Sequence, residues 1–384
     1  MSSFAKSSNL LLALLLSGTV PDSSAASPTE GACEGAGIAI DRAFDGGAFA
    51  ACSIGADGTV TFDIRPEIEP INPSPWYAAR LTQASPVMRR VTLSYHGARH
   101  RYSPWLSVNG GAWQRLDVSA AAPDGSTIAI AIPAFAGSVI IAAQPIRPLA
   151  DVQRQWASQQ QAGRVALAGQ FASRDGRPVP LFRHGPVDAA HIHFFAARQH
   201  PPETTGAAAF DAFAETLLAA DPATRCPGHA FVFAPMINPD GIARGHWRTN
   251  AGRIDPNRDW GRFSEPETAG VGQWVVKASA GAKFVAVLDF HSTRRDALYS
   301  SKTASIAARQ FADGVGKATG LAVSPTQAAE GNTLKSWAES RLTADAFTVE
   351  LADAHSPARA AAIGEAVAQL YLEKLACPSA GELD

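Results

Sequence analysis

Residues 247–260, with the sequence WRTNAGRIDPNRDW, decide the fold of this chain. Three shorter motifs lie far from this stretch: His200-Pro201-Pro202-Glu203 before it, and Leu288-Asp289-Phe290-His291-Ser292-Thr293 and Thr348-Val349-Glu350 after it. Catalytic zinc usually takes three protein ligands from histidine and carboxylate side chains and keeps a fourth position open. The four motifs together therefore predict one metal site.

The spacing of His200 and Glu203 is weak evidence when taken alone. An exposed loop pair shows the same spacing by chance in many chains. Two prolines stiffen the turn between them, so both side chains can face one point, and His291 can complete the ligand set. The prediction depends on the other motifs as much as on this pair.

The block from Asn238-Pro239-Asp240-Gly241 through residues 247–260 resembles the zinc metallocarboxypeptidases, the peptidase family of carboxypeptidase A. The H-P-x-E motif before the block and D-F-H-S-T after it make the resemblance specific. It extends from about Gln170 to the end of the chain and is closest to the cytosolic-carboxypeptidase branch, which carries a β-rich domain ahead of the catalytic one. Residues 72–77 (NPSPWY) and 101–105 (RYSPW) resemble motifs of that domain.

The resemblance implies one Zn²⁺ ion held by His200, Glu203 and His291. Such an ion would acidify a water molecule and polarise the scissile carbonyl group. Glu350 matches the general base of the family, and burial near the metal would suit its carboxylate to accept a proton at neutral pH. The alternative for Glu350 is a buried carboxylate with a structural role.

The resemblance also assigns roles around the reacting carbonyl. Arg248 corresponds to the arginine that stabilises the oxyanion, an interaction on the order of 3 kcal/mol. Asn257 and Arg258 match the pair that holds the terminal carboxylate of the substrate, for which a planar guanidinium is well suited. Asp255 resembles the carboxylate that orients the first histidine ligand, here His200. Ordinary loop polar residues are the alternative reading for Arg248, Asn257 and Arg258, and a loop cap is the alternative for Asp255.

The chain departs from the family pattern near the catalytic glutamate. Many carboxypeptidases carry a mobile tyrosine some twenty residues before it, whereas no tyrosine lies between Tyr299 and Glu350 here. Tyr299 is therefore the nearby candidate for a phenol that contacts substrate. The interval from His291 to Glu350 is also short compared with digestive carboxypeptidases, so their side-chain preference is not transferred.

Composition and pattern predict two domains after a leader. The chain has 384 residues, of which 46% are hydrophobic and 18% charged, which is enough for two buried cores. We expect a signal peptide at residues 1–26, an all-β sandwich-like domain at 27–148 and an α/β catalytic domain at 149–384, with a mixed sheet flanked by helices. In the last part, apolar runs of strand type alternate with helical segments. The expected strands are 191–196, 230–234, 284–290 and 346–351, and the expected helices are 207–220, 266–280, 305–320 and 357–375.

The region before residue 148 is predicted to be made of strands. Residues 91–95 alternate between apolar and polar side chains, and Asn109-Gly110-Gly111 joins two strand-like runs as a hairpin. Residues 126–143 are almost wholly apolar, but Pro133 and Gly137 interrupt them. This pattern predicts two buried strands there.

The N-terminus indicates export. Lys6 precedes an apolar run at residues 10–16 and small residues through Ala26, which is the order found in secretory signals. The run is too short to span a bilayer, so we expect a secreted or periplasmic protein without stable membrane insertion. A formal net charge of −2 provides no basic footprint for nucleic acid.

The four cysteines leave two readings open. Disulfides between Cys33 and Cys52 and between Cys226 and Cys377 would each close within one predicted domain. The other reading is four buried free thiols. No cysteine lies in a C-x-x-C pair, which argues against a zinc ribbon.

The sequence as a whole predicts a zinc-dependent metallocarboxypeptidase that hydrolyses the C-terminal peptide bond of peptides or proteins. Two rival hydrolases remain: an amidohydrolase of the aspartoacylase or succinylglutamate desuccinylase type, and a murein-peptide hydrolase. A peptide-binding protein that has lost catalysis is a hypothesis of another class. It would be favoured by a missing ligand or base, yet all of these residues are present. No motif names the preferred terminal residue or the oligomeric state.

Overall fold

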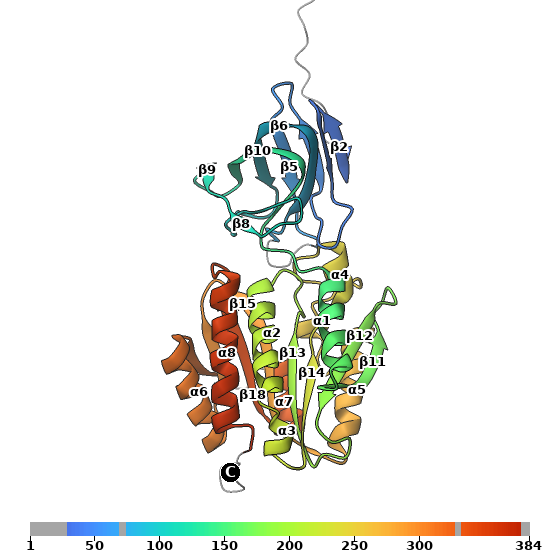
Figure 1. The fold of residues 1–384 in the computed structure, drawn as a ribbon, viewed down its shortest axis with the longest axis vertical. Helices are drawn as coiled ribbons and strands as arrows, with labels where there is room; N and C mark the ends of the chain where they lie inside the picture. Colours follow the sequence, from blue (N-terminus) through green and yellow to red (C-terminus); the bar gives the residue numbers. More distant parts are fainter. Residues whose placement is uncertain (1–28, 69–73, 327–331, 378–384) are drawn as a thin grey trace, which may run out of the picture.

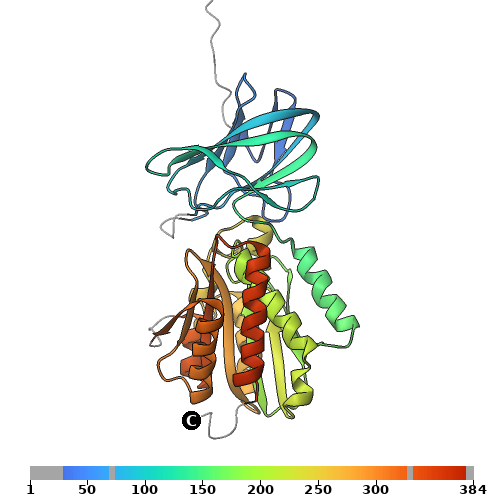
Figure 2. The same ribbon diagram turned by 60° about the vertical axis from the view of Figure 1, so that its left-hand side comes forward.

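The chain forms two regions, each with its own sheet (Figures 1 and 2). The computed structural model describes residues 29–68, 74–326 and 332–377. Strands β1 to β10 make up the N-terminal region, and the elements from α1 to α8 make up an α/β region. The domain boundary expected between residues 148 and 149 falls between β10 (Thr127–Ala142) and α1 (Leu149–Gln161). Residues 1–26, the expected signal peptide, lie outside the described residues.

The N-terminal region is a β-sandwich whose two layers share two long strands, β6 (Ala78–Tyr95) and β10. The first half of β6 pairs with β3 (Ile38–Asp41), and its second half pairs with β5 (Val60–Ile64). β10 follows β6 along both halves, so each long strand passes from one layer to the other. The other strands are β1 (Thr29–Glu30), β2 (Ala32–Gly35), β4 (Ala51–Ile54), β7 (Trp105–Val108), β8 (Gln114–Arg115) and β9 (Val118–Ala121).

Residues 126–143 form one bent strand, so the prediction of two strands was wrong. The pairing of β10 with β6 shifts register between Ile132 and Phe135 and again between Phe135 and Gly137. Pro133 has no N–H for the ladder, and a bulge accommodates it without ending the strand. The hairpin predicted around Asn109 is confirmed, because β7 pairs with β8.

The α/β region is built on an eight-stranded mixed sheet with the order β11-β12-β14-β13-β15-β18-β16-β17. The four central strands β14, β13, β15 and β18 run parallel, while β12 and β16 pair antiparallel with the outer two of them. The strands are β11 (Ala166–Ala172), β12 (Pro178–His184), β13 (His191–Ala197), β14 (His229–Ala234), β15 (Lys283–Thr293), β16 (Ala297–Ser301), β17 (Ala322–Thr326) and β18 (Asp345–Ala352).

Helices cover both faces of this sheet (Figure 1). Alternate side chains of β13 enter the two cores: Phe195 packs with α1, α2, α6 and α8, whereas Phe194 packs with α5 and α7. This arrangement confirms the predicted fold class, a mixed α/β sheet flanked by helices after an all-β region. The helices are α2 (Thr204–Ala219), α3 (Pro222–Arg225), α4 (Pro239–Arg244), α5 (Pro266–Ser279), α6 (Ile306–Thr319), α7 (Leu334–Leu342) and α8 (Pro357–Lys374).

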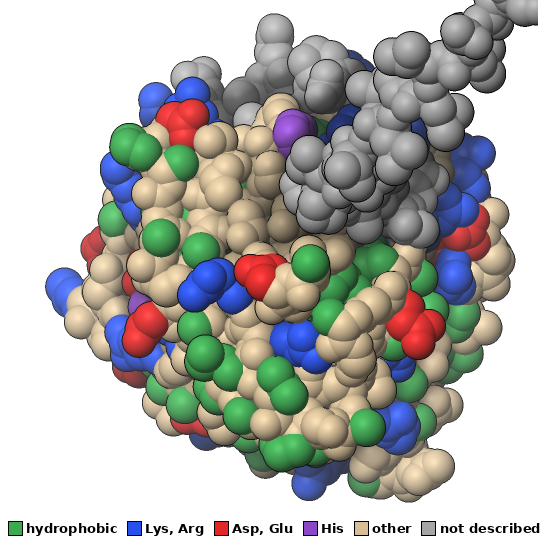
Figure 3. All heavy atoms as spheres, turned by 90° about the horizontal axis from the view of Figure 1, so that it is seen from above, with side chains coloured by type: hydrophobic (Ala, Val, Ile, Leu, Met, Phe, Trp, Pro, Cys, Tyr) green, Lys and Arg blue, Asp and Glu red, His purple; other side chains and the backbone are tan. Residues whose placement is uncertain are grey.

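Both disulfides considered for the sequence are present. Cys33 and Cys52 join β2 to β4, and Cys226 and Cys377 join the segment before β14 to the chain after α8. Among the described helices, none has the length and apolar character required to cross a bilayer. Seen from the end formed by the N-terminal region, basic and acidic side chains are interspersed (Figure 3).

The carboxyl ends of the central strands face the N-terminal region. Arg101 forms an ion pair with Asp353, just after β18, at 2.6 Å. Gln144 Nε2 donates to the carbonyl oxygen of Asp353 at 2.9 Å, and Arg115 Nη2 donates to that of Ala354 at 2.7 Å. The two regions therefore meet at the edge where an α/β sheet usually carries its site.

We expect the stability of the wild type, relative to an Asp353→Asn variant, to fall as pH rises from about 4 to about 7. Burial raises the pKa of Asp353 to about 6, and Arg101 offsets only part of this effect. The folded protein therefore holds the proton more tightly than the unfolded chain, whose carboxyl has a pKa near 3.8. Protonated Asp353 therefore stabilises the folded protein by about 2–3 kcal/mol when the pH is below the pKa of this carboxyl in the unfolded chain. This stabilisation is lost as pH rises through about 6, the pKa of Asp353 in the folded protein.

Urea unfolding of both proteins across this pH range measures the difference in the free energy of unfolding. Asp313→Asn, which removes an exposed carboxylate from α6, is the control. A difference between wild type and Asp353→Asn that stays constant with pH would contradict the prediction.

Candidate metal centre and active site

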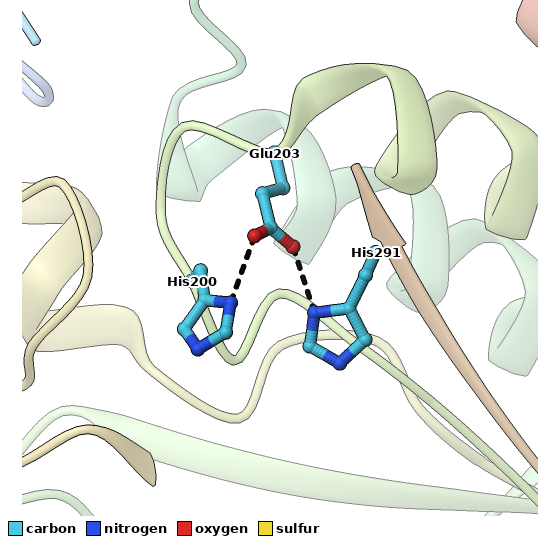
Figure 4. Close-up of side chains that lie close together, drawn as sticks. All are labelled: His200, Glu203 and His291. Atoms are coloured by element: carbon cyan, nitrogen blue, oxygen red, sulfur yellow. Dashed lines mark hydrogen bonds and ion pairs between the residues drawn. The ribbon is translucent and has the colours of Figure 1, made fainter. Parts of the chain in front are cut away.

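The three candidate metal ligands converge at the carboxyl ends of two neighbouring strands. His200 and Glu203 lie between β13 and α2, and His291 lies near the end of β15. Because β13 and β15 are parallel and paired, their carboxyl ends are adjacent. Figure 4 shows both histidines turned toward Glu203, with His200 Nδ1 2.8 Å from Oε1 and His291 Nδ1 2.7 Å from Oε2.

The geometry of this group fits a metal ion. One ligand atom from each of His200, Glu203 and His291 lies within 4.8 Å of the other two. Both histidines are buried, which holds their rings in place. Two imidazole nitrogens and one carboxylate oxygen form a usual donor set for catalytic zinc.

Each of the two histidines contacts a further carboxylate through Nε2, the ring nitrogen that does not face Glu203. His200 Nε2 lies 2.9 Å from Asp255 Oδ1, and His291 Nε2 lies 2.7 Å from Asp289 Oδ2. Carboxylates in this position fix the tautomer and the orientation of a metal-binding histidine, leaving Nδ1 free for the ion. The structure therefore places Asp255 where the resemblance implied. It adds Asp289, which we had not predicted to belong to the site.

The carboxylates also favour positive charge at this centre. Burial lowers the pKa of His200, but Glu203 and Asp255 raise it more, so the net shift is upward. The pKa of His291 is likewise lowered by burial and raised further by Asp289 and Glu203, so that it lies well above its ordinary value. Burial raises the pKa of Glu203, yet the two histidines hold it far below its usual range. The same charge balance that retains protons here can retain a divalent cation.

Glu350 lies beside the metal centre, and one of its carboxylate oxygens makes no hydrogen bond to a described residue. It is paired with His291 across the parallel ladder between β15 and β18, so the two side chains are neighbours on the sheet. Glu350 Oε2 is buried and has no hydrogen-bond partner among the described residues. Burial raises the pKa of Glu350 to about 7. A buried acceptor without a partner suits a group that takes a proton from a water molecule or a substrate.

Arg248 reaches the same centre through Asp255. Its Nε donates to Asp255 Oδ2 at 2.6 Å, while Oδ1 of that carboxylate contacts His200. The two terminal nitrogens of Arg248 make no hydrogen bond to any residue that the structure describes. They are therefore free to donate to a developing oxyanion.

Asn257 and Arg258 follow directly in the short 3₁₀ helix η1 (Pro256–Arg258). Asn257 Oδ1 accepts from the backbone N–H of Leu334 at 2.9 Å, and its Nδ2 lies 3.2 Å from His291 Nε2. With the Nε2 proton of His291 donated to Asp289, that nitrogen cannot accept, so the amide hydrogens of Asn257 remain available to an anion. Arg258 is exposed, and its Nη1 donates to the carbonyl oxygen of Asn257 at 2.7 Å.

Tyr299 lies on β16, opposite Thr348 of β18. Ala297 occupies the position opposite Glu350 on the same ladder. Tyr299 therefore sits two residues further from the carboxyl edge of β18 than the candidate base. A substrate contact by Tyr299 stays a prediction.

A cavity of about 650 Å³ lies between the two regions, next to this site. Trp247 and Thr293 line it; they are the neighbours of Arg248 and of the His291 segment. Three arginines from both regions line it; because Arg101 is paired with Asp353, Arg99 and Arg294 contribute most of its positive charge. The lining residues are Pro75, Gly97, Ala98, Arg99, Arg101, Trp247, Thr293 and Arg294.

The sequence of the α/β region matches a known family. A profile of the zinc carboxypeptidase family matches residues 172–360. This part of the chain belongs to the zinc carboxypeptidase family. The matched carboxypeptidase domain contains His200, Glu203, His291 and Glu350, whereas the N-terminal region lies outside the match.

Curated relatives of this carboxypeptidase domain are much longer proteins. Cytosolic carboxypeptidase-like protein 5 of Ailuropoda melanoleuca is 37% identical over 119 residues, which is 30% of this chain and 12% of that relative. Cytosolic carboxypeptidase 4 of Homo sapiens is 35% identical over 98 residues, 25% of this chain and 8% of that relative. The chain therefore matches only a small part of the length of these relatives.

Solved structures share the fold over most of the chain. A metallo-carboxypeptidase from Burkholderia cenocepacia superimposes with a TM-score of 0.74 at 19% identity, covering 88% of this chain and 98% of that one. A metallo-carboxypeptidase from Pseudomonas aeruginosa in complex with (2-guanidinoethylmercapto)succinic acid gives 0.67 at 18% identity, with 87% and 98% covered. Because such coverage exceeds the carboxypeptidase domain, the N-terminal region is part of the shared fold.

Proposed function

We propose that this protein is a zinc-dependent metallocarboxypeptidase that hydrolyses the C-terminal peptide bond of peptides or proteins, using one Zn²⁺ ion. The observation that carries the proposal is the convergence of His200, Glu203 and His291 beside the unpartnered, buried carboxylate of Glu350. This arrangement combines a metal-binding set with a proton acceptor inside a carboxypeptidase domain.

The residues of the chain have distinct tasks in such a reaction. The ion, when bound by His200, Glu203 and His291, supplies the positive charge that acidifies water and polarises a carbonyl group. Glu350 accepts the proton of the attacking water and can return it to the leaving amine. The free nitrogens of Arg248 donate to the oxygen on which negative charge develops.

Asn257 and Arg258 would make the enzyme cut only at chain ends. An exposed guanidinium beside an available amide can hold the terminal carboxylate of a peptide by charge-assisted hydrogen bonds. The peptide before the cleaved bond would then extend into the cavity beside Trp247. Because Arg99 and Arg294 line that cavity, acidic side chains in this part of the substrate would bind better than basic ones.

We expect removal of C-terminal residues from free peptides and none from the same peptides with an amidated C-terminus. An amide lacks the charge that Arg258 recognises. An Arg258→Ala variant should lose about 10- to 150-fold in kcat/KM on the free peptide, since one hydrogen bond to a charged group contributes about 1.5–3 kcal/mol. Mass spectrometry of a defined peptide pair measures both effects. Arg262→Ala, which removes another exposed arginine from the same loop, is the matched control.

Trimming of the amidated peptide at the same rate would contradict the carboxylate clamp. The same assay separates the rival hydrolases. Cleavage of N-acyl amino acids but not of peptides would indicate the amidohydrolase, and cleavage confined to murein peptides would indicate the cell-wall enzyme. Zinc binding without any cleavage would favour the binding protein.

We also propose that the protein is exported to an oxidising compartment. The two disulfides support this proposal, because such bonds persist outside the reducing cytosol. The order of charged, apolar and small residues at positions 6–26 provides independent support. Cell fractionation with N-terminal sequencing of the mature chain tests it, and recovery of an uncleaved chain in the cytosol would refute it.

A further inference from the structure

The carboxylate of Glu67, in the N-terminal region, binds the backbone of the Arg248 loop. It accepts hydrogen bonds from the N–H groups of three successive residues: Trp247 at 2.8 Å, Arg248 at 2.7 Å and Thr249 at 2.9 Å. The hydroxyl of Thr249 adds a fourth at 3.2 Å. Glu67 comes from the segment just after β5, about 180 residues earlier in the chain.

This contact fixes the loop closely. Oε1 of Glu67 accepts from Arg248 and Thr249, and Oε2 accepts from Trp247, so one carboxylate restrains three consecutive peptide groups. Hydrogen bonds to an ionised acceptor are about twice as strong as neutral ones. Peptide N–H groups in a loop need partners of their own, because no helix or sheet supplies them.

The N-terminal region also binds the Arg248 loop through the side chain of Trp247. Trp247 is buried in the core of the β-sandwich, and its Nε1 donates to the hydroxyl of Tyr102 at 2.8 Å. On the other side of the turn, the side chain of Arg253 donates to the carbonyl oxygen of Glu67. The residues on both sides of Arg248 are therefore held by the sandwich as well as by the carboxypeptidase domain, in which Asn238 Nδ2 donates to the carbonyl oxygen of Thr249 at 3.1 Å.

The backbone position of Arg248 determines where its guanidinium can reach. Its Nε bonds to Asp255, which in turn contacts His200, while its terminal nitrogens make no hydrogen bond to any residue that the structure describes. A guanidinium aimed at a developing oxyanion loses effect when it moves by about 1 Å. The three bonds from Glu67 limit that movement.

We propose that Glu67 is a positioning residue for Arg248, and that the N-terminal region thereby completes the active site of the carboxypeptidase domain. This inference rests on the proposed function, since it assumes that Arg248 acts on the substrate oxyanion. Removal of an oxyanion donor costs about 10²- to 10³-fold in kcat. Loss of the Glu67 contact should cost less than this limit.

The test compares Glu67→Ala, Glu67→Gln, Arg248→Ala and the double variant Glu67→Ala/Arg248→Ala in the full chain. We expect Glu67→Ala to lower kcat about 10- to 100-fold with little change in KM or zinc content. Glu67→Gln keeps one carbonyl acceptor and should retain intermediate activity. In the Arg248→Ala background, Glu67→Ala should have no further effect on kcat, because its action runs through that arginine.

Hydrogen–deuterium exchange provides a readout that does not need activity. Amides of Trp247, Arg248 and Thr249 should exchange faster in Glu67→Ala and not in Asp124→Ala, which removes a carboxylate of the same region that bonds only within its own turn. Unchanged exchange, or equal losses of kcat from Glu67→Ala with and without Arg248, would overturn the proposal. If the wild type cleaves no peptide, the proposed function fails, while faster exchange still supports the anchoring of the loop.

Discussion

A Glu350→Gln variant is expected to lose about 10²- to 10⁴-fold in kcat while keeping its zinc and its fold. Glutamine has nearly the shape of glutamate but cannot accept the proton of an attacking water. Glu350 Oε2 has no partner among the described residues, so the substitution breaks no hydrogen bond at that atom. The loss should therefore appear in the rate and not in the stability.

The side-chain environment gives the reason for so large an effect. Burial raises the pKa of Glu350 to about 7, which makes its carboxylate a stronger base than an exposed glutamate. Its position beside His291 on the ladder places it next to the metal centre. The other carboxylates near the centre, those of Glu203, Asp255 and Asp289, each contact a histidine. Asp289 Oδ1 also lacks a partner among the described residues, but Oδ2 of that carboxylate is held by His291 and Gln199.

Steady-state kinetics and zinc analysis of the purified variant test this prediction. Glu365→Gln, which removes an exposed carboxylate from α8, is the matched control and should leave both quantities unchanged. Glu350→Asp should give an intermediate rate, because it keeps the base but withdraws it by one methylene. Wild-type kcat in Glu350→Gln would show that another group takes the proton.

A Glu203→Gln variant is expected to lose its metal and, with it, all peptide cleavage. Loss of a residue that orients a metal-binding histidine without touching the ion typically weakens metal binding by about 10- to 100-fold. Because Glu203 is proposed to bind the ion directly, we expect its substitution to weaken metal binding more than this. Glu203 also holds the centre together: its oxygens contact His200 and His291, and Oε2 accepts from the backbone N–H of Ser292 at 3.1 Å. A neutral amide would turn its N–H₂ group toward one of these neighbours and carry no charge for the ion.

Competition with a chelator of known affinity measures this loss directly. Glu215→Gln is the matched control, because Glu215 lies exposed on α2, the helix that Glu203 precedes. Circular dichroism should show a folded variant, since the cores on both faces of the sheet do not involve Glu203. Retention of zinc at wild-type affinity would mean that the ion is held by a different set of residues.

The metal ligands and the candidate base could be found from the sequence because each lies in a short motif at or just after a predicted strand end. Parallel strands bring such ends together, so His200, His291 and Glu350 could be placed at one edge before any coordinates were known. Asp289 was missed although a signal existed. It is an acidic residue inside an apolar strand, two positions before His291 and hence on the same face.

Other features could not be predicted, for physical reasons. The contact of Glu67 with Arg248 depends on how the two regions pack. The two residues lie 181 positions apart, and no local sequence pattern indicates which distant residues come into contact. The bend in β10 was read as a break because proline usually ends a strand, whereas a bulge absorbed it here. Helix α1 and the edge strands β11 and β12 were not predicted. Helix α1 buries only Leu149, Val152 and Trp156 in an otherwise mostly polar segment, although their i, i+3, i+7 spacing is a helical signal. Strand β11 lies at the edge of the sheet and buries none of its residues completely.

The link between Cys226 and Cys377 closes a ring with a sequence separation of 151 residues. In the chain-entropy account, a ring of that size lowers the entropy of the denatured chain enough to contribute about 5 kcal/mol to stability, compared with about 3 kcal/mol for the ring between Cys33 and Cys52. The larger ring contains His291 and Glu350, whereas His200 and Glu203 lie ahead of it. When heat or urea unfolds the protein, the segment with His200 and Glu203 is therefore not held to the segment with His291 and Glu350 by this ring. The segment with the base stays cross-linked at both ends, so it loses less conformational entropy when it refolds.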